Sequence, residues 1–248
     1  STQAKTLFPY TTLFRSGLCA MFLRRWLEET PIFAEMKAKK QLVEGLPLKQ
    51  VLGNSKIEVA VSMLLTWLLS AAIVVVILMT PTYLQKQLGI APAMALQANS
   101  LAIVALTVGC IFFGWLNDRF SSGLIFIAGS IGLGGAAYAF YHGVVADQSL
   151  LLILYPLVGF FVGIVGAVPY VMVNAFPPAI RFSGLSFSYN LSYAIFGGLT
   201  PMVVALWLKN EPMAPCYYVM ALCGVGVLVG GWLLSQERQE LTAVPEIN

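Results

Sequence analysis

Six long apolar runs follow one another along most of the chain, and short polar turns separate them. Each run is long enough for an α-helix to cross a hydrocarbon core of about 30 Å, which takes roughly 20 residues. The runs do not alternate polar and apolar positions, so they do not fit the strands of a membrane barrel. We therefore predict an all-α polytopic membrane bundle, with six complete spans at Val59–Thr82, Ala95–Leu116, Gly123–Tyr141, Leu150–Asn174, Ser183–Leu208 and Cys216–Ser235.

The overall composition supports a membrane protein and excludes several other classes. The 248 residues are 58% hydrophobic and only 10% charged, which is more apolar than a soluble domain of this size requires. The net charge of +3 is too small to indicate nucleic-acid binding. Neither the four cysteines nor the lone His142 has a metal-binding or redox spacing. We predict no metal, no cofactor and no enzymatic centre.

Lys and Arg residues gather in the segments on one side of the predicted spans. The linker before the first span, the turns after the second and fourth spans, and the C-terminal tail hold ten of them. The opposite loops carry only Lys86 and Lys209. Positive charge favours the cytoplasmic side, so we expect a multi-pass plasma-membrane protein with the linker and C-terminus in the cytoplasm.

The start of the chain has an unusual origin. Thr6–Ser16 reads TLFPYTTLFRS, an unbroken translation of the tail of a common sequencing adapter. We interpret residues 1–16 as an artefact; the alternative is a short apolar N-terminal segment. Residues 17–57 then hold the end of a cut span and an amphipathic linker, 58–235 the six-helix domain, and 236–248 a polar tail. On this interpretation the natural chain begins further upstream.

The fifth predicted span is the most polar. One helical face collects small and polar residues at spacings of three or four: Ser186, Asn190, Tyr193 and Gly197. Ser188 and Ser192 form a second polar line on the same span. Polar groups are costly in lipid, so these faces must look inward. Two interpretations stay open: close helix packing, which Ser and Gly favour, and the lining of a solute cavity, which suits the bulkier Asn190 and Tyr193.

Two features of this span suggest movement. Gly197 and Gly198 precede Pro201, and proline removes a backbone donor and disturbs the preceding turn. Such a point can bend as a transporter changes state, although simple close packing explains the glycines equally well. Arg181 stands at the start of the span, where it is either a positive-inside anchor or part of a cytoplasmic gate.

The turn after the second span carries a second candidate for gating. Gly114–Arg119 reads GWLNDR, in which Asp118 can cap the next helix or pair with a cation, and Arg119 can bind a carboxylate or lipid phosphate. A short positive-inside loop would explain Arg119 alone. The turn resembles the G-x-L-x-D-R loop of the major facilitator superfamily. It departs from the family pattern after Arg119, where Phe120–Gly123 replaces a glycine and two basic residues.

Two longer motifs resemble one branch of that superfamily, the metabolite:proton symporters. Phe22–Phe33 reads FLRRWLEETPIF, similar to the family's linker, and Phe176–Pro201 reads FPPAIRFSGLSFSYNLSYAIFGGLTP, similar to a block around its eleventh span. The resemblance implies the C-terminal half of a twelve-span secondary transporter for a small polar metabolite. Its expected partners are the solute, protons, the lipid bilayer and the N-terminal half.

The resemblance also implies which spans face the solute. In the superfamily the helices equivalent to spans one, two, four and five line the central cavity, and spans three and six face lipid. That adds Thr66, Ser70, Asn99 and Tyr155 to Ser186, Asn190 and Tyr193 as cavity candidates.

We predict that the complete protein moves an organic acid or a zwitterion such as a betaine by proton symport and alternating access. No span core carries a charged residue, so a proton carrier within this chain would have to be Glu58 or Asp118, at the membrane edge. Two alternatives remain. One is a membrane scaffold or sensor that transports nothing. The other is a multispan enzyme, which the scarcity of carboxylates and histidines disfavours.

Overall fold

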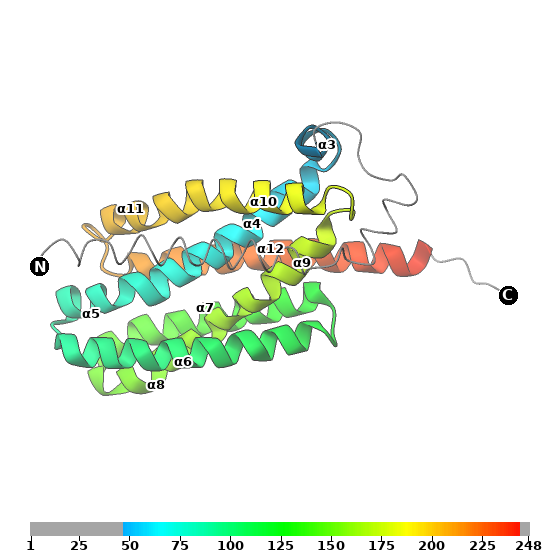
Figure 1. Ribbon diagram of the computed structural model, residues 1–248. Coiled ribbons are helices and arrows are strands. Elements are labelled where there is room, and N and C mark those ends of the chain that lie inside the picture. Colours follow the sequence, from blue (N-terminus) through cyan, green and yellow to red (C-terminus); the bar gives the residue numbers. More distant parts are fainter. Residues whose placement is uncertain (1–46, 244–248) are drawn as a thin grey trace, which may run out of the picture. The chain divides into compact units, whose positions relative to one another are not determined.

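A computed structural model describes residues 47–243 and their side chains from 48 to 239 (Figure 1). The expected artefact at 1–16 and most of the 17–57 linker, with its FLRRWLEETPIF motif, lie outside the described residues. Within them the secondary structure is helical, and six segments are long and apolar enough to cross a membrane. They are Lys56–Leu88, Pro92–Asn117, Ser122–Ala146, Gln148–Ala175, Arg181–Trp207 and Ala214–Gln239. The predicted all-α membrane bundle is confirmed.

Three spans are single helices and three are built of consecutive pieces. The single ones are α6 (Pro92–Asn117), α7 (Ser122–Ala146) and α12 (Ala214–Ala243). The first span consists of α4 (Lys56–Ala72), η2 (Ile73–Met79) and α5 (Thr80–Leu88), and the short α3 (Pro47–Asn54) precedes it. The fourth span comprises α8 (Leu151–Val162), η4 (Gly163–Ala167) and α9 (Val168–Ala175), after the 3₁₀ turn η3 (Gln148–Leu150). The fifth comprises α10 (Arg181–Ser192), η5 (Tyr193–Gly197) and α11 (Gly198–Trp207).

Each interrupted span has its irregular turn just ahead of a proline. The π-helical η2 and η5 and the 3₁₀ turn η4 contain the residues four positions before Pro81, Pro201 and Pro169. Proline has no N–H to offer that carbonyl, and its ring collides with it, so the helix changes geometry locally. We predicted a soft point only at Pro201. Pro81 and Pro169 have the same spacing, but so does Pro156, which lies inside the regular helix α8.

The helices pack in pairs around the first span. α6 lies along α8, α7 lies along α12, and α4 contacts α9, α10 and α12. In Figure 1, α4 crosses in front of α12, with α10 and α11 to one side of it and α6 to the other. Burial differs sharply among the spans: only 17% of the apolar window of α6, and 17% of that of α10–α11, is buried, against 61% for the first span.

Backbone runs directly against backbone where α6 meets α8 and η4. A Cβ added at Gly163 would lie 2.3 Å from the carbonyl carbon of Gly109, and one at Gly159 would lie 2.3 Å from the carbonyl oxygen of Ala102. Atoms cannot approach that closely, so only glycine permits this contact. Close approach through small residues is a common way for helices to associate in lipid.

A carboxylate ties two helices together at the end of the bundle that carries the α6–α7 turn, called the basic end below. The side chain of Glu237 on α12 accepts hydrogen bonds from the hydroxyl of Ser121 and, at 3.4 Å, from the backbone N–H of Gly123. The Ser121 hydroxyl in turn accepts from the N–H of Leu124. Glu237 and Ser121 therefore cap α7, the role that the sequence analysis considered for Asp118.

The opposite end closes with two tight turns. Gly89 ends α5 with a left-handed backbone (φ 66°), which glycine adopts without strain. Asp147 separates α7 from η3, and its carboxylate accepts the backbone N–H of Ser149 at 2.9 Å. That hydrogen bond holds the pKa of Asp147 below its usual value.

The glycine contact predicts a severe effect of one added methyl group. Gly163→Ala should force α6 and η4 apart and lower the free energy of unfolding by about 1–3 kcal/mol. Gly135→Ala is the matched control, because a Cβ there meets nothing within 4 Å. Thermal unfolding of both variants in detergent would show the difference; equal melting temperatures would contradict the inferred backbone contact.

Candidate functional site

The two polar lines of the fifth span face different surroundings. Ser188 and Ser192 are fully buried, and the hydroxyl of Ser192 donates to the carbonyl of Met63 on α4 at 2.8 Å. Asn190 is exposed, and its amide donates to the carbonyl of Ser186 at 2.8 Å. The serine line therefore forms the packed seam with α4, and the line that contains Asn190 remains open.

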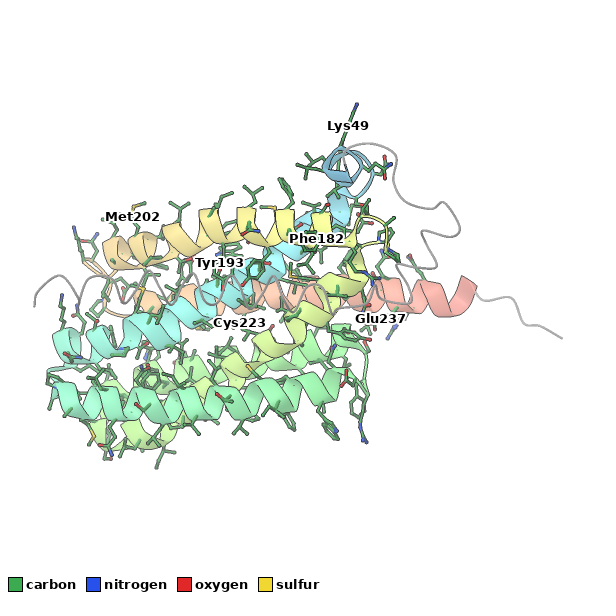
Figure 2. All side chains as sticks on the ribbon, in the orientation of Figure 1. Lys49, Phe182, Tyr193, Met202, Cys223 and Glu237 are labelled. Carbon is green, nitrogen blue, oxygen red and sulfur yellow. The ribbon has the colours of Figure 1, made fainter. Side chains whose placement is uncertain are left out.

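Tyr193 extends the open line to the irregular turn η5. Its ring lies 4.7 Å from that of Tyr189, centroid to centroid. A Cβ at Gly197 would come within 3.3 Å of the Tyr193 ring, so the glycine leaves room for the ring to lie along the helix. Figure 2 shows Tyr193 between the α10–α11 ribbon and α4, which η5 contacts.

An aromatic pair that the sequence analysis did not select joins η5 to α4. Trp67 stacks on Phe196 with centroids 4.5 Å apart and planes 18° from parallel. The Trp67 indole N–H donates to the hydroxyl of Tyr218 at 3.2 Å, and that hydroxyl lies 2.9 Å from the hydroxyl of Thr200. This cluster holds α4, η5, α11 and α12 together. Its members are far apart in sequence, so helix periodicity alone gives no signal for it.

Thr66 and Ser70 lie inside the bundle. Both are almost fully buried. The hydroxyl of Thr66 donates to the Ser62 carbonyl at 2.8 Å and lies 3.4 Å from the sulfur of Met172, and that of Ser70 donates to the Trp67 carbonyl at 3.2 Å. Their polar atoms are thus occupied by their own helix and by α9.

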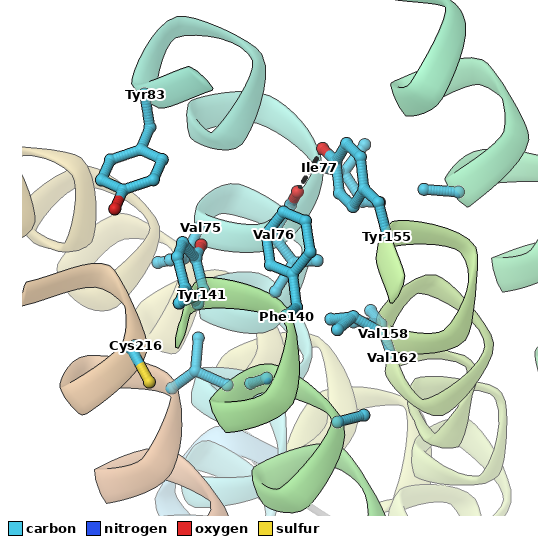
Figure 3. Packing of buried hydrophobic residues seen from close by; sticks show 14 of the residues in the cluster. Val75, Val76, Ile77, Tyr83, Phe140, Tyr141, Tyr155, Val158, Val162 and Cys216 are labelled. Carbon is cyan, nitrogen blue, oxygen red and sulfur yellow. Dashed lines mark hydrogen bonds between the residues drawn. The ribbon is translucent and has the colours of Figure 1, made fainter. Parts of the chain in front are cut away.

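Asn99 and Tyr155 meet at the irregular turn of the first span. The Tyr155 hydroxyl lies 2.7 Å from the carbonyl of Val76 (Figure 3). It also lies 2.6 Å from Oδ1 of Asn99, so one proton serves two acceptors. The Tyr155 ring stacks on Phe140 at 4.9 Å and is fully buried. Tyr155 therefore joins α8 to η2 and α6, while Asn99 keeps part of its surface exposed.

The charged gating candidates lie at the basic end. Asp118 and Arg119 are exposed, and the guanidinium carbon of Arg119 sits 4.6 Å from the centroid of the Trp115 ring. Arg181 is half-buried, and its Nε donates to the carbonyl of Phe176 at 3.2 Å. In this conformation Arg119 contacts its own helix and Arg181 the preceding turn. Gly198 and Pro201 lie in α11, directly after η5.

A cavity of about 440 Å³ opens at the same end, between α4, α9 and α12. Two carboxylates, Glu58 and Glu237, line it together with Tyr170 and Asn174. Across residues 47–243, no three His, Cys, Asp or Glu side chains come together as a metal site would require.

Comparison with known sequences gives a consistent result. Residues 10–201 match the profile of the Major Facilitator Superfamily. A "putative proline/betaine transporter" of Staphylococcus aureus is 28% identical over 222 residues, covering 86% of this chain and 47% of that protein. The "glycine betaine/proline/ectoine/pipecolic acid transporter OusA" of Dickeya dadantii is 29% identical over 238 residues, covering 90% and 46%.

A third relative, the "ectoine/proline transporter ProP" of Corynebacterium glutamicum, is 26% identical. The alignment covers 89% of this chain and 47% of that transporter. The chain thus spans about half the length of the curated relatives it matches. No solved structure matches it.

The Tyr155 contacts predict a structural effect of losing one hydroxyl. Tyr155→Phe leaves the Val76 carbonyl and the Asn99 amide without their shared donor, so the free energy of unfolding should fall by about 1–3 kcal/mol. Tyr138→Phe is the control, since Tyr138 is exposed on α7 and its hydroxyl bonds to none of the described residues. Thermal unfolding in detergent would measure both. Unchanged stability of Tyr155→Phe would mean that the hydroxyl does not hold η2 in place.

Proposed function

Because the chain belongs to the Major Facilitator Superfamily, we propose that it forms the C-terminal six-helix half of a secondary transporter. The complete protein moves a small polar solute across a bacterial inner membrane by alternating access. The basic end is cytoplasmic, as the distribution of Lys and Arg favours. An N-terminal half supplies the other wall of the solute path.

The observation that carries this proposal is the open polar face of α10 and η5. Asn190 is exposed in the middle of a membrane span, beside the aromatic pair of Tyr189 and Tyr193. An amide in contact with lipid is costly, so this face requires a polar neighbour. An aqueous solute path between two halves provides one, and the low burial of this span fits a helix at such an interface.

The three interrupted spans support alternating access. They are the spans equivalent to seven, ten and eleven of a twelve-span transporter, and η2, η4 and η5 give each a point with weakened helical hydrogen bonding. Discontinuous helices commonly lie at transporter binding sites and can bend there. The solute shifts the equilibrium between the inward-open and outward-open conformations only by the difference in its affinity for the two.

The chemistry of this face and the names of the relatives support a zwitterionic solute. Their names specify proline, betaine and ectoine, which are zwitterions. Tyrosine rings attract alkylated ammonium groups, and the amide of Asn190 or the hydroxyl of Tyr193 can donate to a carboxylate. Protons are the proposed coupling ion. On this chain Glu58, which lines the cavity at the basic end, is the carboxylate best placed to exchange them.

Two substitutions test the open face in the complete transporter. Asn190→Ala and Tyr193→Phe should each remove a hydrogen bond to the solute and weaken binding of glycine betaine or proline by roughly 3–10-fold. Equilibrium binding of radiolabelled solute to protein in lipid nanodiscs is the measurement.

Tyr138→Phe serves as the matched control, because it removes an exposed hydroxyl from a span that is predicted to face lipid. If Asn190→Ala and Tyr193→Phe bind as tightly as the control, the face serves helix packing instead.

The proposal also predicts what the chain does alone. With one wall of the path, the 248-residue chain in proteoliposomes should show no saturable uptake of glycine betaine or proline, whereas the complete transporter should. Saturable uptake by the chain alone would refute the assignment of a half. A scaffold without a solute path would instead leave cysteines introduced at positions 190 and 193 of the complete protein closed to water-soluble thiol reagents.

A further inference from the structure

A second cavity, far from the open face of α10, lies at the end of the bundle opposite the basic end. It has a volume of about 280 Å³ and lies between η2, α5, α7, α11 and the start of α12. Its polar lining comes from Thr80, Thr82, Tyr83, Lys86, Gln87 and Tyr141. The nearest α11 residue that lines it, Ala205, is 15 positions after Asn190, or about 22 Å along the helix axis. The two sites are therefore separate.

Lys86 supplies an unneutralised positive charge to this cavity. It is exposed on α5, and its ammonium group makes no ion pair or hydrogen bond with the described residues. The two carboxylates near this end accept hydrogen bonds from backbone N–H groups instead of pairing with Lys86. Asp147 accepts the N–H of Ser149, Glu211 accepts the N–H of Met213 at 3.1 Å, and neither lines the cavity. The cavity therefore favours an anionic group at Lys86.

The deeper polar atoms have a different character. The Thr80 hydroxyl donates to the Val75 carbonyl at 2.9 Å, so the Tyr141 hydroxyl, 2.9 Å away, must donate its own proton to Thr80. That leaves the Tyr141 oxygen as an acceptor. The Tyr83 ring meets the Tyr141 ring edge-on at 5.4 Å, as Figure 3 shows for the two labelled rings. This wall suits an apolar or alkylammonium group rather than a second anion.

Size and charge together select the ligand class. A ligand carrying a carboxylate for Lys86 and a compact apolar or alkylammonium body for the tyrosine wall matches both ends of the cavity. Tyr83 and Lys86 are three positions apart on α5 and so share one face of the helix. A cavity of this volume is at the lower limit of those that hold small molecules.

We propose that this cavity is a second binding site, on the outer side of the membrane, for a small monocarboxylate or zwitterion, and that Lys86 pairs with its carboxylate. The site would collect solute before it reaches the central path. That the ligand is also the transported solute rests on the proposed function; the binding chemistry at Lys86 does not.

Competition at the lysine itself tests the site in the full 248-residue chain. The chain in lipid nanodiscs is pulsed with an amine-acylating reagent, and the modification rates of Lys86 and Lys209 are read by mass spectrometry. Glycine betaine at twice its Kd should slow the modification of Lys86 about threefold, since protection scales as one plus the ratio of ligand to Kd. Lys209, which does not line the cavity, should be unaffected.

Three probes separate the possible outcomes. Acetate should protect Lys86 at higher concentration, whereas choline, which lacks a carboxylate, and chloride should not. Equal protection of both lysines, protection by chloride as strong as by glycine betaine, or no protection by any carboxylate would each overturn the proposal.

A second measurement keeps this result distinct from the proposed transport function. Saturation-transfer NMR of the glycine betaine methyl groups, with Asn190→Ala in every sample to weaken the α10 site, should lose signal in Lys86→Gln and keep it in Lys209→Gln. If the complete transporter does not move glycine betaine but glycine betaine still protects Lys86, the result counts against the proposed function alone. If the complete transporter moves glycine betaine but no carboxylate protects Lys86, the result counts against this site alone.

Discussion

A backbone carbonyl inside a membrane-spanning helix must find a hydrogen-bond donor, because lipid offers none. The first span meets this constraint at its irregular turn. Pro81 cannot donate to the carbonyl four residues before it, and the π-turn η2 shifts the pattern of bonds. The hydroxyl of Thr80 donates to the carbonyl of Val75, and Tyr155, from another helix, donates to that of Val76. The interrupted first span therefore depends on a neighbouring helix, because the hydroxyl of Tyr155 on α8 serves one of its backbone carbonyls.

That dependence explains why the α6–α8 contact matters beyond its own packing. Tyr155 can reach Val76 because α8 lies close to η2, and α8 is fixed along α6 by the backbone contact of Gly159 with Ala102. Asn99 on α6 completes the junction of the three helices. A shift of α6 would therefore break hydrogen bonds in the first span. This couples α6, one of the two least buried segments of the bundle, to the span at its centre.

The sequence could predict the spans, their class and the family, because length, hydropathy and motif order are local properties. It could not decide which line of the fifth span packs against α4. Ser188 and Asn190 lie on nearly opposite faces of similar polarity, and only the contact of Ser192 with Met63 shows which face packs. Tyr155 shows the same limit: a tyrosine within a span suits a cavity or a buried junction equally, until its acceptor is known. Proline spacing alone does not predict the irregular turns either, because Pro81 and Pro169 follow such turns whereas Pro156 lies inside the regular helix α8.

The unequal burial of the spans relates the exposed amides to the exposed apolar residues. The first span is the best-buried of the bundle, and the two least buried, α6 and α10–α11, lie on either side of its helix α4. Both carry exposed apolar residues along with Asn99 or Asn190. Lipid alone would accept the apolar residues but not the amides. A second six-helix half against this face would account for both, since it covers the apolar surface and encloses the amides in a water-filled path. On that arrangement the solute site is shared between the halves, and each half by itself presents only one wall.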